Sequence, residues 1–129
     1  MKEILMKNNL EELSKQLRRF VEERDWSKFH NPKNLSMSLI VESAELVEIF
    51  QWKTANESKK LDAGTIDKVK DEVADILIYL VRICDVLEID LLESAFHKIN
   101  KNRSKYPINL VRGSAKKYSE LASDKKEDS

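Results

Sequence analysis

The sequence predicts an all-α fold, a four-helix bundle. Charged residues make up 36% of the 129 residues and apolar residues 41%, a balance typical of helices that bury one face and solvate another. Only two glycines and two prolines interrupt the chain. No segment alternates apolar and polar residues in the way that a half-buried strand requires. We therefore expect one helical domain at residues 1–112, followed by a polar tail at residues 113–129.

Four segments carry the apolar period of a helix, and capping or turn residues separate them. They cover about residues 8–24, 35–52, 65–87 and 91–106. Asn8 or Asn9 is suited to cap the first helix, and a loop that contains Pro32 separates it from the second. Residues 53–64 are polar and lack periodicity, which predicts a connecting loop, and Pro107 ends the fourth helix.

The third predicted helix is apolar around most of its circumference, in the run ADILIYLVRICDVL at residues 74–87. A helix of this kind needs cover on several sides, and we expect a second copy of the chain to provide part of it. A central helix wrapped by its own neighbours is the alternative. Cys84 lies in this run. A single cysteine among apolar neighbours predicts a small core residue in a reducing, cytoplasmic setting.

The bulk properties exclude several classes of partner. Lys plus Arg and Asp plus Glu number 23 each, so no excess positive charge attracts nucleic acid or an anionic membrane. No apolar run approaches the length of a membrane span, and the first residues become charged too soon for a signal peptide. We expect neither nucleic acid nor membrane among the partners.

Two pairs of carboxylates interrupt the apolar faces of the second and third helices. Glu42 and Glu45 lie three residues apart in VESAELVEIFQW, and Glu72 and Asp75 repeat that spacing. If the two helices are antiparallel, four carboxylates converge, and their mutual repulsion calls for a divalent cation. A set of carboxylate oxygens favours Mg²⁺, for which Mn²⁺ can substitute.

Spacing alone is a weak indication of a metal site, because a chain with 23 acidic residues contains such pairs by chance. Solvated helix faces are therefore the alternative interpretation of both pairs. Glu48 lies at the margin of the same face. It is a further ligand, a residue that supports the ligands, or an exposed side chain.

Three stretches in the same order resemble the MazG-like nucleotide pyrophosphohydrolases, and most closely their dCTP pyrophosphatase branch. They are ERDWSKFHNPKNLSMSLIVESAELVEIFQW, DEVADILIYLVRICDVLEIDL and KINKNRSKYP. The resemblance covers about residues 10–120. It implies an all-α bundle, dimeric or tetrameric, that hydrolyses a nucleoside triphosphate to a monophosphate and pyrophosphate.

The resemblance also implies a metal site and a catalytic group. The metal motif of the family, ExxE followed by ExxD, corresponds here to Glu42, Glu45, Glu72 and Asp75. These carboxylates are expected to hold Mg²⁺ against the triphosphate. Glu42 or Glu45 is expected to orient or deprotonate the attacking water.

The same resemblance implies substrate contacts at six further positions. They are Trp26, His30, Trp52, Tyr79, Lys98 and Asn102. The two tryptophans resemble residues that enclose the base, the tyrosine resembles one that packs against the sugar, and the lysine and asparagine resemble phosphate contacts. The histidine is expected to be structural or a neighbour of the substrate. Each position also has a structural interpretation, as ordinary burial or as part of a solvated face.

The sequence leaves the substrate open. The leading prediction is dCTP or a modified dCTP, in an enzyme that keeps unwanted nucleotides out of the pool. The alternatives are the same chemistry on dUTP, dATP or several dNTPs, and a non-catalytic helical module that only oligomerises. The animal enzymes of the branch carry histidine where this chain has Leu17, which leaves the preference for cytosine undecided.

Overall fold

Each of the four segments predicted to be helical is a helix. The computed structural model describes residues 9–115 and 119–120, and all regular secondary structure within them is helical. The long helices are α2 (Leu10–Glu23), α3 (Pro32–Phe50), α5 (Ala63–Val86) and α6 (Leu91–Lys105). Three short elements accompany them, η1 (Ser27–Phe29, a 3₁₀ turn), α4 (Ala55–Ser58) and α7 (Ile108–Val111). The all-α prediction is confirmed.

The chain divides into two compact units, one that reaches to Ile89 and one that begins at Asp90. The first contains the elements from α2 to α5, and the second contains α6 and α7. Most of the predicted tail, residues 113–129, lies outside the described part of the chain. Among the described residues, no helix is both long enough and apolar enough to cross a membrane.

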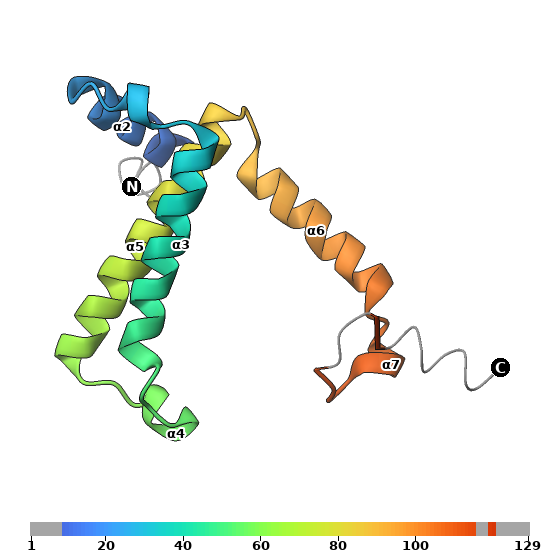
Figure 1. The fold of residues 1–129 in the computed structure, drawn as a ribbon. Helices are drawn as coiled ribbons and strands as arrows, with labels where there is room; N and C mark the ends of the chain where they lie inside the picture. The colour runs from blue at the N-terminus through green and yellow to red at the C-terminus, as the bar shows by residue number, and fades with distance from the viewer. Residues whose placement is uncertain (1–8, 116–118, 121–129) are drawn as a thin grey trace, which may run out of the picture. The chain divides into compact units, whose positions relative to one another are not determined.

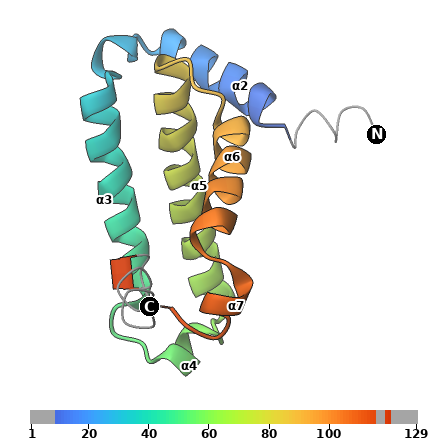
Figure 2. The same ribbon diagram turned by 90° about the vertical axis from the view of Figure 1, so that its right-hand side faces the viewer.

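An antiparallel pair of helices, α3 and α5, forms the body of the first unit (Figure 1). The two helices lie side by side, and the connection that contains α4 lies at one end of the pair (Figure 2). At the other end, α2 packs against α5. Residues midway along α3 therefore lie opposite residues midway along α5.

The second helix begins at Pro32, three residues earlier than predicted. Asn31 caps it, because its side-chain oxygen accepts a hydrogen bond from the Asn34 amide at 2.9 Å. Proline then occupies the first helical position, where the N–H that it lacks would have no partner within the helix. The loop that was predicted around Pro32 thus ends at the cap, and the proline begins a helix instead of interrupting one.

The prediction of a loop across residues 53–64 is wrong in part. Thr54 and Glu57 form a capping box at the start of α4. The Glu57 amide donates to Thr54 Oγ1 at 3.2 Å, and the Thr54 amide donates to Glu57 Oε1 at 3.3 Å. Asp62 then caps α5 by accepting a hydrogen bond from the Thr65 amide at 2.7 Å. These caps fix the short connection between the two long helices.

Two of the helices end on a residue in the left-handed conformation that is not glycine. Asp25 follows α2 and Glu88 follows α5, and each has a φ of 55°. In both cases the next amide bonds back to the last helical turn, from Trp26 to the Val21 carbonyl at 3.0 Å and from Ile89 to the Cys84 carbonyl at 2.8 Å. Both ends therefore have the hydrogen-bond pattern of a Schellman motif.

Few apolar side chains of the described residues are buried. They are Val21, Leu35, Val81 and Cys84, which confirms the core position predicted for the cysteine. Many large apolar side chains stay exposed instead. On α3 these include Met37, Ile40, Val41 and Val47. A partner subunit could cover them, and the homo-oligomer stays a prediction.

Candidate active site

Three glutamates meet where α3 and α5 face each other. Glu42 and Glu45 lie one turn apart on α3, and Glu72 lies on α5. One carboxylate oxygen from each lies within 4.8 Å of the other two. Glu42 and Glu72 are half-buried, whereas Glu45 is exposed. We refer to these three residues as the acidic cluster.

Two oxygens of the acidic cluster are buried without a hydrogen-bond partner, Glu42 Oε2 and Glu72 Oε2. A buried carboxylate oxygen that has lost its water is costly unless a donor or a cation replaces that water. Burial, and next the Glu45 carboxylate, raise the pKa of Glu42 to about 7. The same two causes raise the pKa of Glu72. The cluster therefore lacks positive charge, which a divalent cation can supply.

Asp75 lies one turn beyond Glu72 on α5 and is half-buried. Burial and Glu45 are the main causes of the raised pKa of Glu42, and the charge of Asp75 adds to them. Asp75 is not one of the three residues whose oxygens lie within 4.8 Å of one another. Of the four acidic residues singled out in the sequence, three are in mutual reach and the fourth lies beside them.

A hollow of about 510 Å³ opens beside the acidic cluster. Glu45 and Glu72 line it, so two of the three clustered carboxylates face this space. Glu48 lines it as well, which places this residue beside the cluster. The remaining lining residues are Ile49, Lys53, Thr65 and Lys68.

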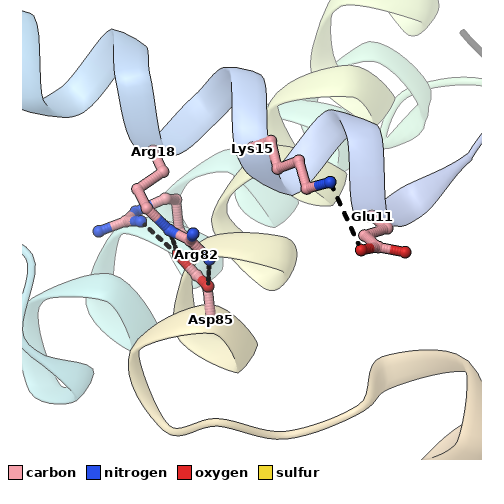
Figure 3. A network of polar contacts seen from close by, with 5 residues as sticks. All are labelled: Glu11, Lys15, Arg18, Arg82 and Asp85. Carbon is pink, nitrogen blue, oxygen red and sulfur yellow. Dashed lines mark hydrogen bonds and ion pairs between the residues drawn. The ribbon is translucent and has the colours of Figure 1, made fainter. Parts of the chain in front are cut away.

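A second polar cluster joins α5 to α2 and to the segment before α3. Arg82 is only 6% exposed, and its guanidinium donates to Asp85 Oδ2 at 2.9 Å and to His30 Nδ1 at 3.4 Å. Asp85 also accepts two hydrogen bonds from Arg18 of α2 (Figure 3). The hydrogen bond from Arg18 is the main reason that the pKa of Asp85 is lowered. The second cluster thus anchors His30, which directly follows η1, while Trp26 lies directly before η1.

The hydrogen bond from Arg82 indicates which tautomer the His30 ring adopts. Because Arg82 Nε donates to Nδ1 of the ring, Nδ1 is an acceptor, and the neutral ring carries its proton on Nε2. Burial, and next the charge of Arg82, lower the pKa of His30, which also favours the neutral ring. His30 therefore presents Nε2–H as a hydrogen-bond donor.

The aromatic residues expected at the base and sugar differ in exposure. Trp26 is 44% exposed and meets Phe20 edge-on, with ring centroids 5.8 Å apart. Trp52 follows α3 and is 89% exposed, so its ring is open to a ligand or to a partner subunit. Tyr79 is half-buried on α5, one turn beyond Asp75. Ordinary burial at a helix end, the structural alternative for the tryptophans, does not describe Trp52.

Lys98 and Asn102, the expected phosphate contacts, lie four residues apart on α6 and share one face of that helix. Lys98 is exposed and Asn102 is half-buried. Both belong to the second unit.

Sequence reasoning missed Lys53, Thr65 and Lys68 in the hollow, and it also missed Arg82. Lys68 precedes Glu72 by four residues, so helical spacing alone places the two on one face. Arg82 is a charged residue within an apolar run and has an acidic residue three positions on. Both patterns were visible in the sequence.

The helical chain is similar to known proteins in sequence and in fold. A family model described as the MazG-like family matches residues 37–121, which include both acidic pairs and α6. The chain belongs to the MazG-like family. The match to the family model spans more than half of the chain, from the second turn of α3 to beyond α7.

The MazG-like chain also has curated relatives. It is 39% identical to dCTP pyrophosphatase 1 of Homo sapiens over 114 residues, which are 87% of this chain and 67% of the relative. It is 40% identical to dCTP pyrophosphatase 1 of Bos taurus over the same length, 87% of this chain and 68% of the relative.

In three dimensions the MazG-like chain is similar to the crystal structure of a pyrophosphatase from Archaeoglobus fulgidus. The TM-score is 0.72 and the sequence identity 46%, over 75% of this chain and 91% of the other. The comparisons confirm the predicted MazG-like all-α fold. They also confirm the predicted enzyme class, a nucleoside triphosphate pyrophosphatase.

Proposed function

We propose that the chain is a Mg²⁺-dependent pyrophosphohydrolase that converts dCTP, or a modified dCTP, to the monophosphate and pyrophosphate. The observation that carries this proposal is the acidic cluster. Two helices bring three glutamates together, and two buried carboxylate oxygens there lack a partner. The relatives support the substrate, since they are dCTP pyrophosphatases. Such an activity removes unwanted nucleotides from the pool.

The donor set fits Mg²⁺. Glu42, Glu45 and Glu72 offer only carboxylate oxygens, with Asp75 beside them, and hard oxygen ligands are those that Mg²⁺ prefers. Mn²⁺ accepts the same ligands and is expected to substitute. A cation here would also compensate the two buried oxygens that lack partners. When bound, it supplies positive charge opposite the phosphoryl oxygens of the transition state.

The residues of the chain supply the remaining steps. Water attacks the α-phosphate, the bond between the α-phosphorus and the bridging oxygen breaks, and pyrophosphate leaves with that oxygen. The proton of the water passes to a carboxylate. Glu42 and Glu45 are both candidates for this role, because they lie on one face of α3 at the acidic cluster.

The nucleoside contacts follow the family resemblance. Trp26 and Trp52 are proposed to enclose the base, and because they lie beyond opposite ends of α3, the two rings that meet one base come from different subunits of the proposed oligomer. Tyr79 is proposed to pack against the sugar, where a ring would disfavour a 2′-hydroxyl. His30 is proposed as a neighbour of the substrate that donates through Nε2–H. The phosphate contacts proposed on α6 are Lys98 and Asn102. We also propose that the enzyme is a homodimer or homotetramer in the cytoplasm.

Release of pyrophosphate from a panel of dNTPs and NTPs with Mg²⁺ tests the proposal. The wild-type chain should act best on dCTP or on a modified dCTP, and Glu45→Ala should lower kcat/KM by at least about 100-fold. Asp71→Ala is the matched control, because Asp71 is an exposed acid next to Glu72 in sequence. It should retain full activity.

Two results would count against the proposal. If no nucleotide releases pyrophosphate although the protein is folded and Mg²⁺ is present, the catalytic assignment is wrong. If dUTP or dATP is hydrolysed better than dCTP, the enzyme class stands and the substrate is corrected.

A further inference from the structure

The charged side chains that line the hollow beside the acidic cluster change from acidic to basic along the helix pair. On α3 and the residues after it, Glu45 and Glu48 come first and Lys53 follows toward α4. On α5 the order is reversed, so Lys68 lies one turn before Glu72 and closer to α4. Because the helices are antiparallel (Figure 1), the order of the residues along each helix places both lysines closer to α4 than Glu45 and Glu72, while Glu48 lies between Glu45 and Lys53.

The two lysines differ from Lys70, on the same helix as Lys68, in having no side-chain partner within the described part of the chain. Among the described residues, neither Lys53 nor Lys68 forms an ion pair or a side-chain hydrogen bond, whereas Lys70 pairs with Asp67 at 3.8 Å. Hydrogen bonds from Thr65 are the main reason that the pKa of Asp62 is lowered, and both lysines contribute their charge to this effect. The two ammonium groups therefore act on the same end of the unit.

Positive charge continues beyond the hollow. Lys53 also lines a neighbouring hollow of about 540 Å³, together with Lys59 and Lys60 and with Asn56 and Glu57. A polyanion that leaves the acidic cluster in this direction thus meets several lysines in succession. Lysine is a common phosphate ligand, as a flexible point charge.

We propose that Lys53 and Lys68 bind the pyrophosphate half of the substrate, so that the triphosphate runs from the acidic cluster toward α4. The proposal rests on the proposed function. Lys53 follows α3 and Lys68 lies on α5, so a pyrophosphate group between them is held by both helices. Thr65 lines the same hollow, and its hydroxyl is a further hydrogen-bonding group.

The three glutamates of the hollow set a condition on this binding. Glu45, Glu48 and Glu72 repel an anion, and two lysines do not outweigh three carboxylates. Pyrophosphate therefore binds only when a divalent cation neutralises the acidic cluster. With Mg²⁺, the lysines add to an attraction that is already present.

Binding of pyrophosphate and of dCMP, each followed by calorimetry on the full chain with Mg²⁺, tests the proposal. Lys53→Met and Lys68→Met should each raise the Kd for pyrophosphate by about fivefold, and the double variant by about twentyfold. The Kd for dCMP should not change. Lys70→Met is the matched control, since Lys70 is an exposed lysine on the same helix outside the hollow, and it should bind both ligands as the wild type does.

Several results would overturn the proposal. One is an unchanged Kd for pyrophosphate in the double variant. Another is a weaker dCMP affinity with pyrophosphate unaffected, which would mean that the substrate runs in the opposite direction. A loss in Lys70→Met equal to that in Lys68→Met would reveal a general charge effect, and equal pyrophosphate binding in EDTA would exclude a role for the acidic cluster.

The same variants separate this proposal from the proposed function. If the wild type hydrolyses dCTP and the lysine variants bind pyrophosphate normally, only the pyrophosphate subsite is wrong. If pyrophosphate binding depends on the two lysines but no nucleotide is hydrolysed, the subsite stands and the catalytic assignment fails.

Discussion

The buried charged groups of this molecule are of two kinds, those that have hydrogen-bond partners and those that lack them. Arg82 is buried against Asp85 and His30, and each of these groups has a hydrogen-bond partner. Glu42 and Glu72 instead hold buried oxygens without one. Paired groups of the first kind stabilise the fold, whereas unpaired groups of the second kind cost free energy that a bound ligand can recover. The difference separates a structural cluster from a binding site.

The acidic cluster should make the stability of the metal-free chain depend on pH. Folding raises the pKa of Glu42 from 4.5 to about 7, so between these values the folded chain keeps a proton that the unfolded chain has released. The contribution of this group is therefore present at low pH and is lost as pH rises through about 7. Mg²⁺ binds the deprotonated carboxylates and should restore the lost stability.

Thermal unfolding in EDTA checks this expectation. The Tm of the wild type, relative to that of Glu42→Gln, should fall between about pH 5 and pH 8, because only the wild type loses a proton at this position. The lowered pKa of His30 acts in the opposite direction, but it is common to both proteins. The carboxyl of Glu72, whose pKa is also raised, acts in the same direction as that of Glu42. A difference in Tm that does not vary with pH would contradict the expectation, as would a wild-type Tm at high pH that Mg²⁺ leaves unchanged.

The two arginines that bind Asp85 should differ in their effect on stability. Arg82→Met removes a buried guanidinium and leaves His30 Nδ1 without its donor, so the free energy of unfolding should fall by about 2 kcal/mol. Arg18→Met removes a side chain that is 52% exposed, and its effect should be much smaller. Urea unfolding of both variants measures the difference. Equal losses would show that burial does not distinguish the two ion pairs.

At the scale of elements, the length of a helix decided whether the sequence could predict it. The four long helices repeat their apolar period several times, so the pattern accumulates and only their ends were misplaced. α4 has four residues and no period, and only the T-x-x-E capping box at Thr54 indicated it. The start of α3 likewise depended on Asn31 as a cap and not on apolar spacing. Capping hydrogen bonds, more than burial of apolar side chains, therefore determine the short helix and the helix start that periodicity could not predict.

The helix ends offer a stabilising substitution. Glu88 has a φ of 55°, a conformation that side chains with a Cβ atom adopt at a cost and glycine adopts freely. Glu88→Gly should therefore raise the free energy of unfolding by up to about 1 kcal/mol, since the Schellman hydrogen bonds come from the backbone. Differential scanning calorimetry at pH 7 measures the change in Tm. Lys59→Gly is the control, because Lys59 has an ordinary φ of −86°, and it should not raise the Tm.

At the scale of the whole molecule, the sequence predicted which helices carry the acidic pairs but not what surrounds them. The i,i+3 spacing of Glu42 and Glu45 is a property of one helix, so it is visible without a structure. Lys53 lies beyond the end of α3, where helical spacing no longer places a side chain. Its position in the hollow depends on how the α4 connection folds, and that depends on several caps at once. A site built across a connection is therefore harder to predict than one built within helices.

The exposed apolar side chains of α3 allow a test of the predicted subunit association. Ile40 is 69% exposed and Val47 is 58% exposed, and burial of such a side chain in an interface contributes about 2 kcal/mol. A glutamate at either position would lose that contribution and place a charge in an apolar contact, so Ile40→Glu should raise the dissociation constant by at least about 100-fold.

Size-exclusion chromatography with light scattering checks the expected change. The wild type should elute as a dimer or tetramer, and Ile40→Glu and Val47→Glu should shift toward the monomer as concentration falls. Asn56→Glu adds the same charge at an exposed polar position on α4 and should leave the oligomer intact. A wild type that is monomeric at all concentrations would contradict the predicted homo-oligomer. The exposed apolar side chains of α3 would then be a contact surface for another molecule, because such surfaces usually mark interaction sites.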